Sequence, residues 1–244
     1  MEVIGIFGPT GVGKTGVAIA LAELLRERGE DPVAINCDAL QVYEGLEVLT
    51  GTATPEEQAR LEHRLLGFVP VTEDFSVGDY MPLAHREVDA ALEAGRRPLV
   101  VGGTGLYLRA AVAELSLTKV PPESEESELW SPQTRHPTVI FGLDMDRERL
   151  YERIDARVEA IVAGGAEEEA RRAEALGPGR TARKALGFDD LLAGDLEAMK
   201  KRSRNYARRQ LTWMRKIPNL EPIDRTGLSD EGVAAQMLRI GWRP

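Results

Sequence analysis

The sequence predicts an α/β fold in which a mostly parallel sheet is covered by helices on both faces. Short apolar segments alternate with longer segments of helical spacing along most of the chain, a pattern typical of parallel sheets. A glycine-rich loop follows the first apolar segment, and an acidic residue or further glycines follow two later ones. With 244 residues and 43% hydrophobic content, the chain can bury a full core as one domain.

The first element is a strand expected over residues 3–7, which leads into the motif GPTGVGKT at residues 8–15. A helix is expected to follow over residues 17–28. The motif has the form G-x-x-x-x-G-K-[ST], and a strand before it and a helix after it are the context in which such a loop binds phosphate groups. The fold is therefore expected to be P-loop NTPase-like, and the chain to handle a phosphorylated ligand.

Each residue type in this loop has a chemical reason. Glycines let the backbone turn with its N–H groups pointing inward, Lys14 adds a point charge, and the Thr15 hydroxyl can hold Mg²⁺. We therefore expect Mg²⁺ as a cofactor, with Thr15 as the metal ligand. The loop residues expected to bind phosphates are Gly8, Thr10, Gly11, Gly13, Lys14 and Thr15.

The remaining elements continue the alternation. Further strands are expected over residues 32–37, 97–101 and 139–143, and further helices over residues 84–94, 105–114, 146–163, 166–176 and 195–216. Because ligands of such folds bind at the carboxyl ends of the strands, the phosphate loop, Asp38 and the Gly102-Gly103-Thr104 turn should meet at one edge of the sheet.

Residues 118–137 break the pattern, because they are rich in Pro and Glu. They are expected to form a linker or mobile loop. The predicted organisation is thus a single α/β core made of residues 1–117 and 138–244, interrupted by this loop.

The formal net charge of −9 at first argues against a nucleic-acid partner. The charge is segregated, however, because residues 200–216 contain no Asp or Glu. The basic residues of this stretch are Lys200, Lys201, Arg202, Arg204, Arg208, Arg209, Arg215 and Lys216. A helix with these residues is expected to bind a polyanion or a diphosphate.

Other function classes are disfavoured by composition. One cysteine, Cys37, cannot form an internal disulfide or a cysteine-based metal site. No apolar stretch approaches the roughly 20 residues that span a bilayer, and no charged leader precedes the first strand. We expect a cytoplasmic monomer with no membrane contact.

The phosphate loop alone leaves three classes of function open: a kinase, a nucleotide-driven switch, and a transferase whose substrate loses a diphosphate. Kinases and switches usually hold Mg²⁺ with an acid at the end of a second apolar strand. The best candidate strand, residues 97–101, instead runs into glycines, and the nearest carboxylate at a strand end is Asp38.

Five phrases now identify a family. GPTGVGKT, NCDALQVY, PLVVGGTGLYL, RKALGF and ARRQLTWMRK occur in this order at the spacing found in tRNA dimethylallyltransferases and the related adenylate isopentenyltransferases, which the chain resembles over about four fifths of its length. The resemblance implies that the loop holds the diphosphate of dimethylallyl diphosphate. It also implies that the prenyl group passes to the exocyclic N6 of an adenine, most simply in the anticodon loop of tRNA.

The resemblance also assigns roles to single residues. Asp38 matches the family's proton acceptor for N6–H, which an adenine amine needs because its lone pair is delocalised into the ring. Thr104 and Arg157 match residues at the reaction centre, and Arg157 would also bind the diphosphate. The catalytic set is therefore Asp38, Lys14, Thr15, Thr104 and Arg157. Adenine or nucleic-acid contacts are expected from Asp38, Gln41, Arg204, Arg208 and Arg209.

The resemblance breaks at residues 118–137. Family members that act on tRNA carry a helical insertion there that grips the anticodon stem-loop, and this chain also lacks a phrase of the QRLxRALE kind. Three alternatives to a tRNA acceptor therefore stay open: prenylation of a free adenine nucleotide, a small-metabolite kinase, and a non-catalytic nucleotide-binding module.

Overall fold

A computed structural model describes residues 2–116 and 128–241, and the six strands in this part of the chain form one parallel sheet. The strand order is β3-β2-β4-β1-β5-β6. Their bounds are β1 Val3–Phe7, β2 Pro32–Asn36, β3 His63–Arg64, β4 Arg97–Gly102, β5 Thr138–Asp144 and β6 Leu220–Asp224. The expected α/β fold is confirmed.

The central strand β1 places the phosphate loop in the middle of one sheet edge. All five of its residues are buried, as expected for a parallel strand covered on both faces. Phe7 pairs with Gly102 of β4 on one side and with Gly142 of β5 on the other, so β1 and β4 end at the same level and β5 continues to Asp144.

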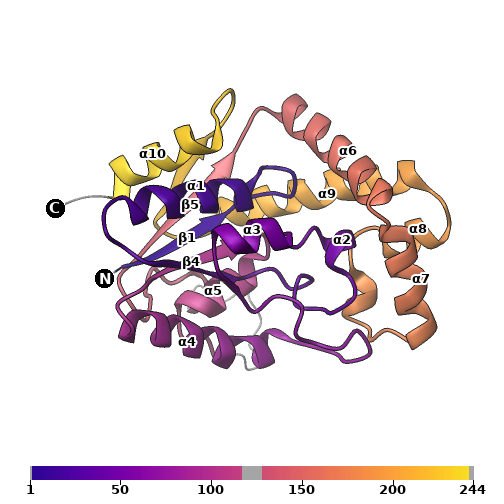
Figure 1. The fold of residues 1–244 in the computed structure, drawn as a ribbon, viewed down its shortest axis with the longest axis horizontal. Coiled ribbons are helices and arrows are strands. Elements are labelled where there is room, and N and C mark those ends of the chain that lie inside the picture. The colour runs from indigo at the N-terminus through magenta and orange to yellow at the C-terminus, as the bar shows by residue number, and fades with distance from the viewer. Residues whose placement is uncertain (1, 117–127, 242–244) are drawn as a thin grey trace.

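Helices cover both faces of the sheet (Figure 1). Helix α1 (Lys14–Arg26) packs with α10 (Asp230–Gly241) over one face, and α4 (Val77–Glu93) packs with α5 (Gly105–Val112) over the other. Each face has its own core of buried aliphatic and aromatic side chains.

A third group of helices lies beyond the carboxyl ends of the strands (Figure 1). Its members are α2 Glu47–Thr50, α6 Arg147–Ala163, α7 Ala166–Leu176, α8 Phe188–Leu192 and α9 Leu196–Met214, with a short 3-10 turn at Ala182–Lys184. Helix α3 (Pro55–Arg60) lies beside α1, and the 3-10 turn Glu128–Trp130 contacts α5 and the end of α9. Most of the group shares a separate apolar cluster. Helix α9 links this cluster to α5, and therefore reaches back to the sheet.

The structure differs from the expected elements in segments where polar residues interrupt the apolar pattern. Helix α4 starts at Val77 instead of residue 84, because Ser76 and Asp79 form a reciprocal capping box and Pro82 is tolerated in the first turns. Strand β6 and helix α10 were not expected; β6 is an edge strand that contains Glu221 and Asp224, so its apolar pattern is weak.

Part of the expected Pro- and Glu-rich loop is tied to the core. Residues 118–127 lie outside the described residues, but residues 128–137 are described. The buried Arg109 guanidinium donates to the carbonyl oxygens of Leu129 at 3.0 Å and Ser131 at 2.8 Å. Arg135 makes two hydrogen bonds to Asp89. This half of the segment therefore packs against the core.

Candidate active site

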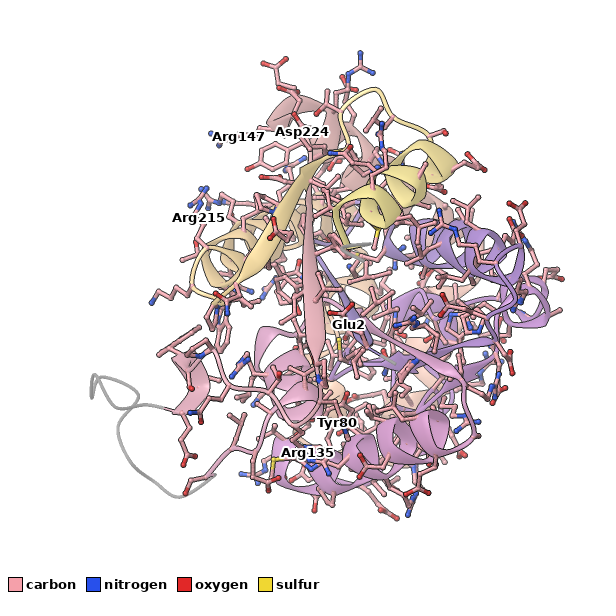
Figure 2. All side chains as sticks on the ribbon, turned by 90° about the vertical axis from the view of Figure 1, so that its left-hand side faces the viewer. Glu2, Tyr80, Arg135, Arg147, Arg215 and Asp224 are labelled. Atoms are coloured by element: carbon pink, nitrogen blue, oxygen red, sulfur yellow. The ribbon has the colours of Figure 1, made fainter. Side chains whose placement is uncertain are left out.

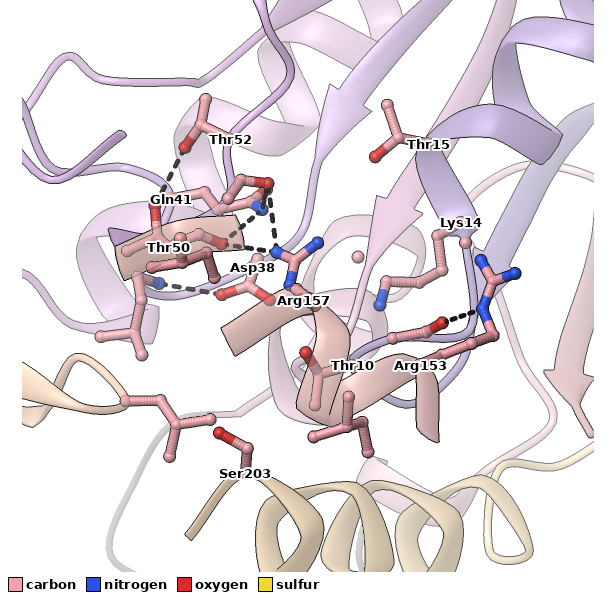
Figure 3. A pocket seen from close by; sticks show the side chains of 18 of the residues that line it. Thr10, Lys14, Thr15, Asp38, Gln41, Thr50, Thr52, Arg153, Arg157 and Ser203 are labelled. Carbon is pink, nitrogen blue, oxygen red and sulfur yellow. Dashed lines mark hydrogen bonds between the residues drawn. The ribbon is translucent and has the colours of Figure 1, made fainter. Parts of the chain in front are cut away.

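A cavity of about 490 Å³ opens at the carboxyl ends of the strands (Figure 3). The phosphate loop and the start of α1 form one wall, the loop after β2 forms another, and α6 and α9 close the remaining sides. The polar residues of the sequence-based set that line it are Thr10, Lys14, Thr15, Asp38, Gln41 and Arg157.

The phosphate loop has the backbone that its glycines predict. Gly11 and Gly13 have φ values of +80° and +89°, a region that glycine adopts without strain. A Cβ at Gly11 would also lie 2.8 Å from the Ile154 side chain of α6, so the loop and α6 can approach this closely only with glycine there. Gly13 immediately precedes α1, whose N-terminus therefore faces the cavity.

Lys14 carries a positive charge that the protein only partly satisfies. Its Nζ donates to the carbonyl oxygens of Gly8 and Pro9, each at 3.1 Å. Burial lowers the pKa of Lys14 to about 8, against the opposing attraction of Asp38. An anion in the loop would supply the missing countercharge.

Asp38 is held by its own loop. Its Oδ1 accepts from the Leu40 backbone N–H at 3.1 Å, and its backbone N–H donates to Oδ1 of the buried Asn36 at 3.0 Å. No cation in residues 2–116 and 128–241 forms an ion pair with Asp38. Figure 3 shows Asp38 and Lys14 facing one space from different walls. The carboxylate is thus fixed in direction and able to accept a proton.

Arg157 and Gln41 converge on the same backbone. The Arg157 guanidinium donates to the carbonyl oxygens of Thr50 and Gly51 at 3.2 and 3.4 Å, and the Gln41 amide donates to the same two at 3.3 and 3.1 Å. Burial lowers the pKa of Arg157. Both side chains are therefore positioned at the wall that faces the phosphate loop (Figure 3).

Thr104 does not line the cavity. Its hydroxyl accepts from the Ala39 backbone N–H at 3.1 Å, directly after Asp38. It precedes the first residue of α5, and so it connects the Asp38 loop to that helix. The placement suits support of Asp38 rather than contact with a ligand.

The basic helix is less free of acids in space than in sequence. Arg204 makes hydrogen bonds of 2.8 and 2.7 Å to the two carboxylate oxygens of Asp155 in α6. Lys200 pairs with Glu159 of the same helix. Arg208 and Arg209 are exposed, and neither has a carboxylate partner among the described residues. Of the three α9 residues expected to contact nucleic acid, Arg208 and Arg209 are therefore the two whose charge no described carboxylate neutralises.

Gln210 was not expected to take part, yet it ties two walls of the cavity together. Its Oε1 accepts from the Thr10 backbone N–H at 2.8 Å, and its Nε2 donates to the Gly103 carbonyl oxygen at 2.9 Å. A Cβ at Gly103 would lie 2.3 Å from that Nε2. One signal could have revealed it: the buried stripe of α9 repeats at helical spacing through Ser203, Ala207, Gln210 and Met214.

Arg225 was also missed. Its side chain is buried, donates to the Val12 carbonyl oxygen in the phosphate loop and pairs with Asp230 at 2.8 Å. It lies just after β6, in a stretch where no element was expected, and no local sequence pattern marks it.

The expected Mg²⁺ has one candidate ligand, Thr15, which lines the cavity. The described residues contain no group of three or more His, Cys, Asp and Glu side chains arranged to hold a metal ion. Mg²⁺ commonly keeps several waters and is held by substrate phosphates with one or two protein groups. The donor set fits an ion that enters with a diphosphate.

No helix in the described ranges is long and apolar enough to cross a membrane.

Comparisons with known proteins agree with the five phrases. The family model described as IPP transferase matches residues 41–131 and 116–217, and the model described as isopentenyl transferase matches residues 1–74. The chain is 33% identical to a tRNA dimethylallyltransferase of Salinispora tropica, over 98% of this chain and 92% of the relative. It is 34% identical to the protein of that name from Kineococcus radiotolerans, over 94% and 93%.

Solved structures give the same result. A full-length tRNA isopentenylpyrophosphate transferase from Bacillus halodurans has a TM-score of 0.85 at 26% identity, covering 98% of this chain and 95% of that one. A eukaryotic dimethylallyltransferase acting on tRNA has a TM-score of 0.79 at 21% identity, covering 100% and 80%, and it shares the fold. The Salinispora alignment extends over 301 positions, more than the 244 residues of this chain, so it contains gaps on this side.

Proposed function

This chain belongs to the IPP transferase family of tRNA dimethylallyltransferases, and we propose that its cavity joins the dimethylallyl group of dimethylallyl diphosphate to the exocyclic N6 of a tRNA adenine. The observation that carries this proposal is that a site for a diphosphate and a proton acceptor lie in one cavity. A phosphate loop with the Lys14 cation lines the same space as the Asp38 carboxylate, which has no cationic partner among the described residues.

The diphosphate lies in the phosphate loop. Backbone N–H groups of the loop, the N-terminus of α1 and the Lys14 ammonium face it, and they neutralise the charge that grows as the C1–O bond breaks. Arg157 closes the opposite side of the cavity. Since the leaving group takes the bonding electron pair, these cations contribute more in the transition state than before it.

The adenine lies against Asp38. The N6 lone pair forms the new bond to C1 of the dimethylallyl group while the C1–O bond to the diphosphate breaks. The proton that N6 then loses passes to the Asp38 carboxylate. The Leu40 N–H and the Thr104 hydroxyl hold the Asp38 loop in place, and Gln41 offers its side-chain oxygen to the nucleotide.

Mg²⁺ would be held by the Thr15 hydroxyl and by diphosphate oxygens, and would stabilise the leaving group as a Lewis acid. The side chains of the protein have separate tasks: Lys14 binds the diphosphate, Gln210 holds the phosphate loop in place, and Asp38 takes the proton.

The segment at residues 118–137 is proposed to replace the helical insertion that grips the stem of tRNA. Two findings support this reading. The IPP transferase model matches in two pieces that meet at residues 116–131, and the alignment with the Salinispora relative is longer than this chain. The expectations of a cytoplasmic location and a monomer stay predictions.

Incubation of the pure protein with labelled dimethylallyl diphosphate and tRNA, AMP or ATP tests the proposal. We expect label in tRNA at low salt, and loss of that product in Asp38→Asn. Labelling of AMP or ATP with none in tRNA would instead select a free nucleotide acceptor. Transfer of phosphate from ATP to a small molecule, with no prenyl product, would select a kinase.

A further inference from the structure

The buried Arg225 lies behind the phosphate loop, on the side away from the cavity. Strand β6 ends at Asp224, at the same end of the molecule as Arg147 at the start of α6 (Figure 2). The backbone of Arg225 is fixed on both sides, because its N–H donates to the Asp144 carbonyl oxygen and its carbonyl oxygen accepts from the Leu228 N–H, both at 2.9 Å. Arg225 is only 5% exposed and does not line the cavity. Its guanidinium therefore reaches the loop from the rear, with little freedom to move.

The contact between Arg225 and the loop fixes the direction of one peptide group. Nη1 of Arg225 donates to the Val12 carbonyl oxygen. Val12 is buried and does not line the cavity, whereas Gly13 does. In a planar trans peptide the C=O group and the N–H group that follows it point in opposite directions. The Gly13 N–H therefore points away from Arg225, toward the cavity, and it has no hydrogen-bond partner among residues 2–116 and 128–241.

Asp230 holds the guanidinium in this place. Nη2 of Arg225 donates to Oδ1 of Asp230, the first residue of α10, at 2.8 Å. A Cβ at Gly16 would lie 2.1 Å from Oδ2 of Asp230, and a Cβ at Gly13 would lie 2.3 Å from Nη1 of Arg225. Glycine at both positions therefore allows the ion pair to pack directly against the loop and the first turn of α1.

Stability alone does not explain this arrangement. The Arg225 Nε is buried and has no hydrogen-bond partner in the described part of the chain. A buried donor without a partner lowers the stability of the fold. The guanidinium thus keeps its contacts with Val12 and Asp230 while one of its donors stays unsatisfied, which indicates that its position serves the loop.

We infer that Arg225 is a positioning residue for the donor: it holds the Val12 carbonyl oxygen behind the loop and so directs the Gly13 N–H at the diphosphate. Asp230 keeps Arg225 in place. The planar fork of arginine can hold a carbonyl oxygen and a carboxylate at the same time, a geometry that the compact ammonium of lysine does not reproduce. The inference rests on the proposed function, because it takes a diphosphate to lie in the phosphate loop.

Inorganic diphosphate is the probe for the test, because its binding does not require transfer of a prenyl group. Isothermal titration calorimetry with Mg²⁺ present gives its dissociation constant for the wild type, Arg225→Met and Arg225→Lys. The methionine variant removes the guanidinium, and the lysine variant keeps the positive charge. Arg239→Met is the matched control, since it removes an exposed arginine of α10 that does not line the cavity. Urea unfolding measures the stability of each variant.

A second measurement observes the peptide group itself. Valine precedes glycine at only three places in the sequence, at residues 12–13, 77–78 and 101–102. Labelling of valine carbonyl groups with ¹³C and of glycine nitrogen with ¹⁵N therefore isolates the Gly13 N–H in an NMR spectrum, together with the signals of Gly78 and Gly102. Diphosphate should shift the Gly13 proton downfield in the wild type and in Arg239→Met, because this N–H gains a charge-assisted hydrogen bond.

Arg225→Met should raise the dissociation constant of diphosphate about tenfold and remove most of the Gly13 shift. Arg225→Lys should lie between Arg225→Met and the wild type in both measurements, and it decides alone if Arg225→Met fails to fold. Wild-type affinity and a wild-type Gly13 shift in both variants would overturn the inference, even if urea unfolds them more easily, because Arg225 would then only brace the fold. Wild-type behaviour of Arg225→Lys alone would also reject it, since charge without the arginine geometry would then suffice.

Prenylation assays separate this inference from the proposed function. Arg225→Met should raise KM for dimethylallyl diphosphate and leave KM for tRNA unchanged. Prenylated tRNA formed by Arg225→Met with wild-type KM values keeps the proposed function and rejects the positioning role. Diphosphate binding that depends on Arg225, with no prenylated RNA from the wild type under any condition, keeps the positioning role and rejects the proposed function.

Discussion

At the scale of single residues, the cavity places a proton acceptor and a group that stabilises negative charge on different walls. Asp38 has no cationic partner in the described chain and is oriented by the Leu40 N–H, whereas Lys14 is desolvated against backbone carbonyls. A reaction that transfers a cation-like group from a diphosphate to a weak amine needs both.

Asp38→Asn should leave the fold intact and lower the single-turnover rate about 10²- to 10⁴-fold, because the amide cannot take the proton from N6. Rapid-quench measurement with saturating dimethylallyl diphosphate and tRNA checks this. Glu44→Gln is the control, since it removes an exposed carboxylate a few residues further along the chain. A wild-type rate in Asp38→Asn would remove Asp38 from the chemistry.

Lys14 should make donor binding depend on pH. Its pKa is lowered to about 8 in the ligand-free protein by burial, so the charged form that binds a diphosphate prevails below pH 8 and is lost as the pH rises above it. The affinity for dimethylallyl diphosphate should therefore fall above about pH 8, although the diphosphate itself is fully ionised there.

Isothermal titration calorimetry between pH 6.5 and 9.5 measures this loss of affinity. Lys14→Met should bind dimethylallyl diphosphate weakly, and its affinity should stay constant over the upper half of this pH range. The free energy of unfolding of the ligand-free protein should instead rise as the pH rises above about 8, because the folded state buries the neutral amine more easily than the charged one. A wild-type affinity that stays constant up to pH 9.5 would contradict the assignment of Lys14.

At the scale of elements, helix α9 connects the two ends of the site. Its inner stripe reaches the phosphate loop and the turn after β4 through Gln210, and its outer side carries the exposed Arg208 and Arg209. The loop that binds phosphate is thus braced by a helix that lies about 200 residues further along the chain.

Gln210→Leu keeps the size of the side chain but leaves the Thr10 N–H and the Gly103 carbonyl unpaired. We expect it to lower the free energy of unfolding by about 1–3 kcal/mol and to raise KM for the donor more than it lowers kcat. Urea unfolding and steady-state kinetics check both quantities. Gln236→Leu, on α10 outside the cavity, is the control. An unchanged KM for the donor would show that the bridge is structural only.

Elements and residues with local signals could be predicted from the sequence. The phosphate loop, Asp38 and the helices over residues 166–176 and 195–216 follow from patterns a few residues long. Gln210 and Arg225 could not be found in this way, because each acts on the phosphate loop through a contact between residues about 200 positions apart. The pairing of Arg204 with Asp155 could not be predicted for the same reason, since a count of the charges along α9 does not include the acidic residues of α6.

At the scale of the whole molecule, we propose that the α/β core carries the chemistry and that residues 118–137 add little to the binding of tRNA. The overall charge is −9, so we expect the arginines of α9 that have no carboxylate partner among the described residues, Arg208 and Arg209, to be the main attraction for a polyanion. Affinity that rests on phosphate contacts is sensitive to salt.

The chain should therefore bind tRNA more weakly, and with a stronger dependence on salt, than relatives with the insertion. Replacing residues 118–137 with the helical insertion of a family member that carries one should restore affinity, while a Gly/Ser linker of equal length should not. Filter binding between 50 and 300 mM salt measures the effect. Tight, salt-insensitive binding by the unaltered chain would mean that another surface grips the RNA.

The central claim is that donor and acceptor meet in the cavity between Lys14 and Asp38. A crystal structure with an unreactive analogue of dimethylallyl diphosphate and a hairpin RNA tests it most directly. We expect the diphosphate on Lys14 and Thr15, and an unpaired adenine whose N6 lies within hydrogen-bond distance, about 3 Å, of the Asp38 carboxylate. A diphosphate outside the phosphate loop, or an adenine that does not reach Asp38, would contradict the account.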